Sequence, residues 1–170
     1  MKPSAETLVE QHLDALYGMA KAWTRDPDLA QDLVHRCFLK AFERRSQLRE
    51  PGSARAWLIA ILRNEIAGEH RARGRFLDWD AEDFEALPHA DESTEPWRPE
   101  LLEALPAALD RLADGHRQVL LLRYQQELSY EAIAGILDVA LGTVMSRLHR
   151  AKTALKVELA DDEPGRRGTG

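Results

Sequence analysis

The chain has 170 residues, of which 44% are hydrophobic and 31% charged, and its 23 lysines and arginines stand against 29 aspartates and glutamates, for a formal net charge of -6. This is the composition of a folded globular protein, because a disordered chain has fewer apolar residues and a collagen-like chain far more glycine and proline. The single cysteine, Cys37, excludes a disulfide-stapled secreted scaffold, since it has no partner within the chain.

The sequence shows no signal for a membrane or for secretion. Its longest apolar runs, such as 119–122, are far short of the roughly 20 residues that span a bilayer. Residues 1–6 include an acid and lack the apolar stretch of a secretory signal. We therefore expect a cytoplasmic protein with no direct insertion into a membrane.

Three amphipathic helices are expected in the first part of the chain. Apolar residues at helical spacing over 8–23 mark the first. Asp26 followed by proline is the pattern of an N-cap and a first turn, and the apolar stripe over 29–42 continues it as the second helix. The third is expected to be capped by Ser53 and to bury one face of 57–66. This part of the chain is a predicted helical bundle.

The middle of the chain has a different composition. Residues 78–100 hold one basic and nine acidic side chains with three prolines, whereas residues 1–77 hold 13 basic and 10 acidic side chains, and residues 101–170 hold 9 and 10. Such a shift, without a sustained apolar period, predicts a linker. Two interpretations stay open: a solvated tether, or a segment whose acids and aromatics occupy a basic groove on a partner.

Helical spacing returns after the linker. Helices are expected over 101–112 and 114–124, then from a cap at Ser129, and finally over about 143–159. No segment alternates with period two for long enough to predict a strand. The fold class is therefore all-α, with two small helical domains joined by an acidic linker. The expected boundaries are a first domain at 1–77, the linker at 78–100, a second domain at 101–160 and a disordered tail at 161–170.

The last two helices have the pattern of a helix-turn-helix. Ala134 is small where a partner helix crosses, Asp138 can occupy a tight turn, and Val144 points inward. The final helix carries four basic residues and no acid between 142 and 157. A helix of this kind fits the major groove of DNA, its first turns facing base edges and its later cations facing phosphates. The solvated-face alternative is weaker, because the turn and Val144 fit the motif.

Catalytic and metal-binding patterns are not found in the sequence. The six histidines lack paired ligand spacing, although His35 near Cys37 is a weak metal or redox alternative. No glycine-rich phosphate loop, nucleophile elbow or Ser/His/Asp arrangement occurs. We expect no enzyme, no cofactor and no metal.

The order of these parts resembles a bacterial RNA polymerase sigma factor of the extracytoplasmic-function class, within the sigma-70 family. Residues 128–134 and 142–152 are similar to region 4.2, which reads the minus-35 promoter element in that family. The resemblance covers nearly the whole chain. It implies that the minus-35 contacts come from Thr143, Met145, Ser146, Arg147, His149, Arg150 and Lys152.

The first part resembles sigma region 2. Residues 32–38 are similar to region 2.2, which docks on the clamp of the polymerase β′ subunit, and this implies core contacts from Asp32, Leu33, Val34, His35 and Phe38. Residues 56–64 and 71–75 are similar to regions 2.3 and 2.4, which open and read the minus-10 element. The loop at 48–53 would hold a flipped base. The implied minus-10 contacts are Arg63, Asn64, Arg71, Arg73 and Arg75.

Two departures from the family pattern stand out. The family usually has Gln-Glu where this chain has His35-Arg36, and a basic residue where it has Met145. The resemblance implies as partners core RNA polymerase, through its β′ clamp and β flap, promoter DNA, and an anti-sigma factor that is often tied to a membrane signal. It also implies that the linker threads the RNA exit channel, with Asp80, Glu82, Asp83 and Glu85 mimicking nucleic acid.

Two other functions remain as alternatives. A sigma-like decoy that sequesters an anti-sigma factor would account for the altered His35-Arg36 pair. A stand-alone helix-turn-helix regulator would dimerise and bind a palindrome without polymerase. Binding to core polymerase separates both from a sigma factor.

Overall fold

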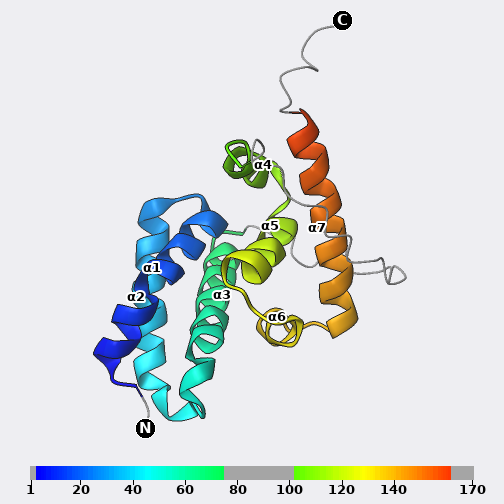
Figure 1. Cartoon of the computed structure of the whole chain (residues 1–170). Coiled ribbons are helices and arrows are strands. Elements are labelled where there is room, and N and C mark those ends of the chain that lie inside the picture. The colour runs from blue at the N-terminus through cyan, green and yellow to red at the C-terminus, as the bar shows by residue number, and fades with distance from the viewer. Residues whose placement is uncertain (1–2, 75–101, 162–170) are drawn as a thin grey trace, which may run out of the picture.

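The computed structural model describes residues 3–74 and 102–161, and within these ranges every regular element is a helix (Figure 1). The all-α prediction is confirmed. Asp80, Glu82, Asp83 and Glu85 lie outside the described residues, as does Arg75. The first group of elements is α1 (Ala5–Thr24), α2 (Pro27–Glu43), the short 3-10 turns η1 (Arg45–Gln47) and η2 (Pro51–Ser53), and α3 (Ala54–Ala72). The second group is α4 (Leu105–Arg111), α5 (Asp114–Leu120), the π-helical turn η4 (Leu121–Gln125), α6 (Tyr130–Leu137) and α7 (Leu141–Asp161).

Side chains fix where the first helices begin. The Ser4 hydroxyl accepts a hydrogen bond from the Thr7 amide at 3.0 Å and starts α1. One carboxylate oxygen of Asp26 accepts from the amides of Asp28 and Leu29 at 3.1 Å each, with proline in the first turn of α2, as the sequence predicted. The expected cap at Ser53 is wrong. Its hydroxyl instead donates back to the Glu50 carbonyl at 2.8 Å and stabilises the preceding turn.

The first three helices pack as a bundle around an apolar core. Each helix presents one stripe to the other two, and burial of these side chains is the main term that holds the bundle together. The rings of Phe38 and Phe42 stack on the α2 face with their centroids 6.1 Å apart. The fully buried side chains at the centre of the bundle include Leu8, Leu16, Met19, Leu33, Cys37, Leu58, Leu62 and Ile66.

Helix α5 does not continue as the regular helix that the sequence predicted to residue 124. It widens into the π turn η4, closed by a hydrogen bond of 3.0 Å from the Gln126 amide to the Leu121 carbonyl. The Arg123 guanidinium donates to the Leu128 carbonyl at 2.9 Å and lies 4.6 Å from the centre of the Tyr130 ring. This pair of contacts ties the π turn to the start of α6.

Helices α6 and α7, with the turn that joins them, form the predicted helix-turn-helix. The Ser129 hydroxyl caps α6 by accepting from the Ala132 amide at 3.1 Å, and Asp138 ends it in the left-handed conformation with φ 54° and ψ 50°, both as predicted. Helix α7 begins at Leu141, two residues earlier than expected, and runs through Asp161. Val144 is fully buried, and Leu148, Ala151 and Leu155 follow it on the inner face.

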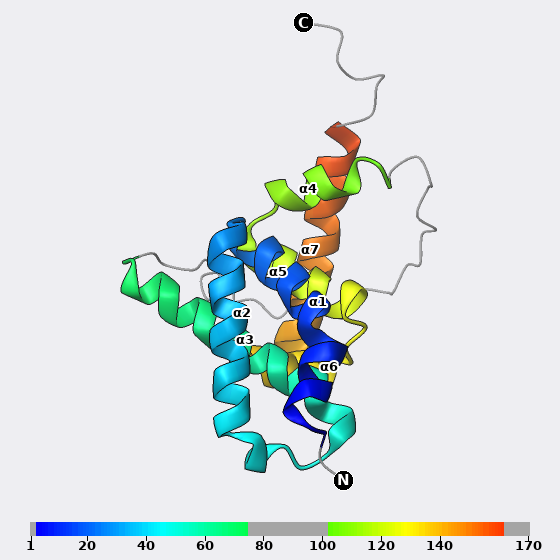
Figure 2. The same cartoon turned by 90° about the vertical axis from the view of Figure 1, so that its left-hand side faces the viewer.

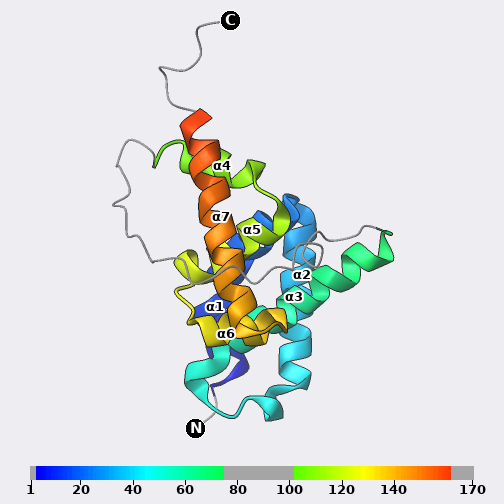
Figure 3. The same ribbon diagram turned by 90° about the vertical axis from the view of Figure 1, so that its right-hand side faces the viewer.

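The two groups of helices pack against each other. Helix α6 contacts α3, and α5 contacts α1, so the helix-turn-helix lies beside the last helix of the first group (Figures 2 and 3). Arg25, in the left-handed conformation at the end of α1, donates to the carbonyls of Asp110 at 2.5 Å and Leu112 at 3.3 Å. Its guanidinium also lies 4.0 Å from the Asp114 carboxylate.

Among the described residues, no single helix has the length and apolar character needed to cross a membrane. Within the same residues, the one candidate of sufficient length and composition is the pair α6 and α7 together, which is bent by 100° at the junction.

Candidate nucleic-acid and polymerase interfaces

The outer face at the start of α7 combines polar and apolar side chains. Met145 is 38% exposed, His149 is exposed, and Thr143 is half-buried. The Ser146 hydroxyl donates to the Gly142 carbonyl at 3.0 Å, one turn earlier, so its oxygen lone pairs stay available as acceptors. This turn offers methyl-type contact from Met145 together with donors and acceptors, the mixture that reads base edges in a major groove.

The cations of α7 are not equally accessible. Arg147 is buried, whereas Arg150 and Lys152 are half-buried, and the Lys152 ammonium lies 5.6 Å from the centre of the Tyr124 ring. Arg150 and Lys152 therefore reach the surface, and Arg147 belongs to the inner part of the helix. That Arg147 contacts DNA stays a prediction, and its burial does not favour it.

Helix α2 exposes only part of the segment that resembles the core-binding region. Leu33, Val34 and Phe38 are buried in the bundle, so their side chains pack against α1 and α3. The Asp32 side chain is 61% exposed, and His35 is exposed. An outer face of α2 available to a partner therefore contains these two residues, not the three apolar ones.

Leu39 completes this outer face and was missed by the sequence analysis. It lies four residues after His35 and seven after Asp32, on the same side of the helix, and it is 50% exposed. The i, i+3 and i+7 spacing of Asp32, His35 and Leu39 was the signal that could have found it.

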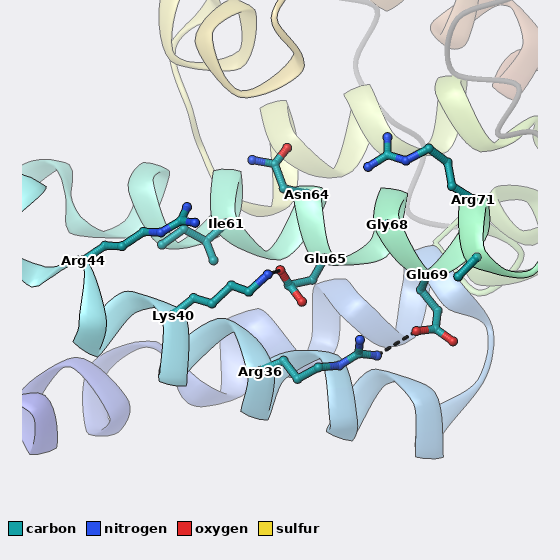
Figure 4. Close-up of a pocket in the computed structure, with 10 residues that line it drawn as sticks. Arg36, Lys40, Arg44, Ile61, Asn64, Glu65, Gly68, Glu69 and Arg71 are labelled. Carbon is teal, nitrogen blue, oxygen red and sulfur yellow. Dashed lines mark hydrogen bonds and ion pairs between the residues drawn. The ribbon is translucent and has the colours of Figure 1, made fainter.

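A groove with a cavity of about 510 Å³ lies between α2 and α3 (Figure 4). The exposed Asn64 stands at one side, and the side chain of Arg71 lies two turns further along α3. On the floor, the Lys40 ammonium forms an ion pair with Glu65, whose side chain is buried. The side chains that line the groove are those of Arg36, Lys40, Arg44, Ile61, Asn64, Glu65, Glu69, Arg71 and Ala72, together with Gly68.

A second ion-pair network crosses from α2 to α3 at the other end of the groove. Arg36 contacts Asp32 at 2.9 Å and Glu69 at 2.8 Å, and Arg73 contacts Glu69 at 2.8 Å. The hydrogen bonds from Arg36 and from Arg73 lower the pKa of the Glu69 carboxyl below its ordinary value. Arg36, the basic residue that departs from the family pattern, is therefore ion-paired with two acidic residues of this chain, Asp32 and Glu69.

The four residues predicted to read the minus-10 element that the structure describes lie in different surroundings. Asn64 and Arg71 are exposed, Arg63 is half-buried, and Arg73 is exposed but paired with Glu69. The structure brings Asn64 and Arg71 together on the groove.

Cys37 has the environment of a core residue. Its thiol donates to the Leu58 carbonyl at 3.3 Å, and burial raises the pKa of the thiol to about 12. His35 is exposed, so the two side chains point to different sides of α2. In the described ranges, no group of three or more histidine, cysteine, aspartate or glutamate side chains could hold a metal ion.

The comparisons with known proteins follow the same division of the chain. The family model described as Sigma-70 region 2 matches residues 8–76, and the one described as Sigma-70, region 4 matches residues 102–155. A solved structure of similar fold is the sigma factor RpoE in complex with the anti-sigma factor NepR from Bartonella quintana. It has a TM-score of 0.68 and 29% identity, and the match covers 91% of this chain and 96% of that one.

Two curated relatives span most of this sequence. The ECF RNA polymerase sigma factor SigE of Mycolicibacterium smegmatis is 37% identical over 93% of this chain, although this chain spans only 62% of SigE. The ECF RNA polymerase sigma factor SigL of Mycobacterium tuberculosis is 33% identical, and the match covers 91% of this chain and 88% of SigL. The chain thus belongs to the sigma-70 family of RNA polymerase sigma factors, in its extracytoplasmic-function class.

Proposed function

We propose that this protein is an alternative sigma factor that directs core RNA polymerase to specific promoters and is controlled by an anti-sigma factor. The observation that carries the proposal is the presence of region 2 and region 4 in order on one chain, each with an exposed polar surface on its reading helix. The chain itself makes and breaks no bond in this role. It supplies promoter choice and strand opening to the polymerase.

Helix α7 is the minus-35 reader in this proposal. Its first turns enter the major groove, where Met145 contacts a thymine methyl and His149 offers a ring nitrogen to a base edge. Arg150 and Lys152 neutralise phosphates and supply the salt-dependent part of the affinity. Met145 stands where the family usually has a basic residue. The minus-35 sequence that this chain reads therefore differs from that read by relatives with a cation at this position.

Helix α3 and the groove beside it are the minus-10 reader. Asn64 hydrogen-bonds an unpaired base, and the helix end that carries Arg71 and Arg73 lies against phosphates of the duplex just upstream. The turn at 48–53 takes the flipped base, whose extrusion costs a few kcal/mol that stacking and hydrogen bonds must offset. Both reading helices then contact one promoter, with residues 78–100 as the tether.

Polymerase docking is assigned to the outer face of α2. Asp32, His35 and Leu39 form a patch of charge and apolar surface that suits the β′ clamp, and the second domain meets the β flap. An anti-sigma factor is the natural regulator, because RpoE, of similar fold, is bound by one. The acid-rich residues 78–100 are proposed to pass through the basic RNA exit channel.

The test is to mix the purified full chain with bacterial core polymerase and fragmented genomic DNA of its source, and to map transcript starts. Defined starts that depend on the chain establish a sigma factor, and the DNA upstream of them gives both promoter elements. If the chain binds no core, the proposal fails. Capture of an anti-sigma factor would then favour the decoy, and unaided binding to a palindrome the stand-alone regulator.

A further inference from the structure

One carboxylate at the end of α3 is shared by two arginines. Glu69 accepts from Arg36 of α2 through one oxygen and from Arg73, the C-cap residue of α3, through the other, both at 2.8 Å. The Glu69 side chain is only 19% exposed, whereas that of Arg73 is 46% exposed. Arg73 is therefore an outward-facing cation whose charge is matched from within the chain.

The neighbouring arginine is in a different state. Arg71 is exposed on the same end of α3 and forms no ion pair among the described residues. The two arginines lie on one helix end that the proposed function places against duplex phosphates. Arg71 meets phosphate directly, while Arg73 must first leave Glu69.

We propose that Glu69 is a positioning residue that withholds Arg73 from DNA phosphates, so that the free chain binds DNA with one contact fewer than its arginines allow. The inference rests on the proposed function, because it assigns the end of α3 to DNA. Glu69 takes the Nε–H of Arg73, and a phosphate that binds this guanidinium through two parallel donors including Nε needs the same hydrogen, so the two anions compete for Arg73.

The competition favours Glu69 because that carboxylate is fixed in place. Arg36 holds its second oxygen and is itself held by Asp32 at 2.9 Å, so Glu69 cannot follow Arg73 outward. The spacing of four residues from Glu69 to Arg73 also places the acid before the base, the favourable order on a helix. A phosphate gains Arg73 only by breaking a contact that is already formed.

The test compares the full-length protein with its Glu69→Gln variant in binding to a labelled DNA duplex of mixed sequence, by fluorescence anisotropy over a range of salt concentrations. Glu10→Gln is the matched control, because Glu10 is exposed on α1 and its change alters the net charge equally. Relative to that control, Glu69→Gln is expected to bind about two- to fivefold more tightly. The slope of log affinity against log salt is expected to steepen by about 0.9, the value for one more phosphate contact.

The Arg73→Ala change shows whether the gain passes through Arg73. In the Glu69→Gln background it should abolish both the gain in affinity and the steeper slope, while in the native background it should change neither by much. The inference is overturned if Glu69→Gln binds no more tightly than Glu10→Gln, or if the gain persists without Arg73. A tighter complex with an unchanged slope also contradicts it, because Arg73 would then already contact phosphate.

Binding to core polymerase tests the proposed function independently of these DNA-binding measurements. Circular dichroism melting checks that each variant is folded, and gel filtration with core polymerase tests docking, which involves neither Arg73 nor non-specific duplex. Loss of core binding in the native chain would count against the sigma-factor assignment. Normal core binding with no effect of Glu69→Gln would count against this inference alone.

Discussion

The guanidinium of Arg25 donates a hydrogen bond of 2.5 Å to the carbonyl oxygen of Asp110, 85 positions further along the chain. This carbonyl and that of Leu112 lie at the C-terminal end of α4, where helix carbonyls lack partners within the helix and carry partial negative charge. Arg25 thereby caps a helix that belongs to the other sigma region. Beside it, burial and the charge of Arg25 lower the pKa of Arg117, whose guanidinium contacts Asp114 at 2.8 Å.

Replacement of Arg25 by alanine is expected to loosen the packing between the two groups of helices. The change removes two charge-assisted hydrogen bonds at a partly exposed site, together worth about 1–2 kcal/mol. Small-angle X-ray scattering should show a larger radius of gyration for the variant. Lys21→Ala is the control, since Lys21 is on the same helix and stacks on Tyr17 instead. Equal radii for Arg25→Ala and the native chain would show that α3 and α6 hold the two groups without it.

Asp138 should tolerate glycine but not valine. Its φ of 54° lies in the left-handed region, where a branched Cβ collides with the backbone, whereas glycine fits freely. Asp138→Val is expected to lower the free energy of unfolding by about 1–2 kcal/mol, and Asp138→Gly to leave it unchanged or raise it. Urea unfolding measures both. A valine variant as stable as the native chain would mean that the turn can adopt another conformation.

Cys37 is expected to make the fold less stable in alkali. The thiol has a pKa of about 12 in the folded protein against an ordinary value of 9.0, so the unfolded chain ionises first as the pH rises. The contribution is present in full below pH 9 and is lost between pH 9 and about 12, at about 1.4 kcal/mol per pH unit. Urea unfolding at pH 8 and pH 10 should show a smaller loss in Cys37→Ala than in the native chain. An equal loss of stability between pH 8 and pH 10 in the variant and the native chain would show that Cys37 does not cause it.

Arg150→Ala is expected to lower transcription from the mapped promoters without affecting core binding. Arg150 lies on α7, one turn after Ser146, and its contact to the promoter is worth about 1–3 kcal/mol if it reaches a base edge. Run-off transcription gives the loss, and gel filtration with polymerase gives the control. Arg150→Lys separates charge from geometry, because lysine keeps the charge but not the planar pair of donors. Full activity of the alanine variant would exclude a role in promoter recognition.

Asn64→Ala is expected to leave the closed promoter complex intact and to impair strand opening. Asn64 is exposed, so its replacement has little effect on the free energy of unfolding. What the change removes is the side-chain amide that would hydrogen-bond an unpaired base. Permanganate reactivity of opened thymines in the minus-10 region reports the defect. Thymines that react as in the native complex would contradict the assignment of Asn64.

Local sequence signals predicted much of the fold. The caps at Asp26 and Ser129 are encoded within three residues of the helices they start, and the inward position of Val144 follows from helical period. The left-handed turn at Asp138 was likewise predicted from its neighbours. Ser53 failed because its hydroxyl has a competing acceptor, the Glu50 carbonyl, at equal sequence distance.

The contacts between distant segments could not be predicted. Nothing near Arg25 in the sequence points to Asp110, and nothing near Glu69 points to Arg36. A sequence motif on a helix includes residues of both its exposed and its buried face. The motif resemblance therefore selected buried residues together with exposed ones. Leu33 and Phe38 lay on the apolar stripe of their helix, and that periodicity was the better guide to their burial.

The π turn η4, which follows α5, accommodates one residue more than a regular α-helical turn. A π turn places five residues where an α-helical turn closes with four, so Leu121–Gln125 accommodates one residue beyond the regular repeat. The extra residue rotates the downstream segment about the helix axis, and Arg123 can then lie over Tyr130. Loss of one residue here would let the helix close regularly and would turn the start of α6 relative to α5. The orientation of the helix-turn-helix formed by α6 and α7 is thus sensitive to chain length at η4, a turn that lies outside it.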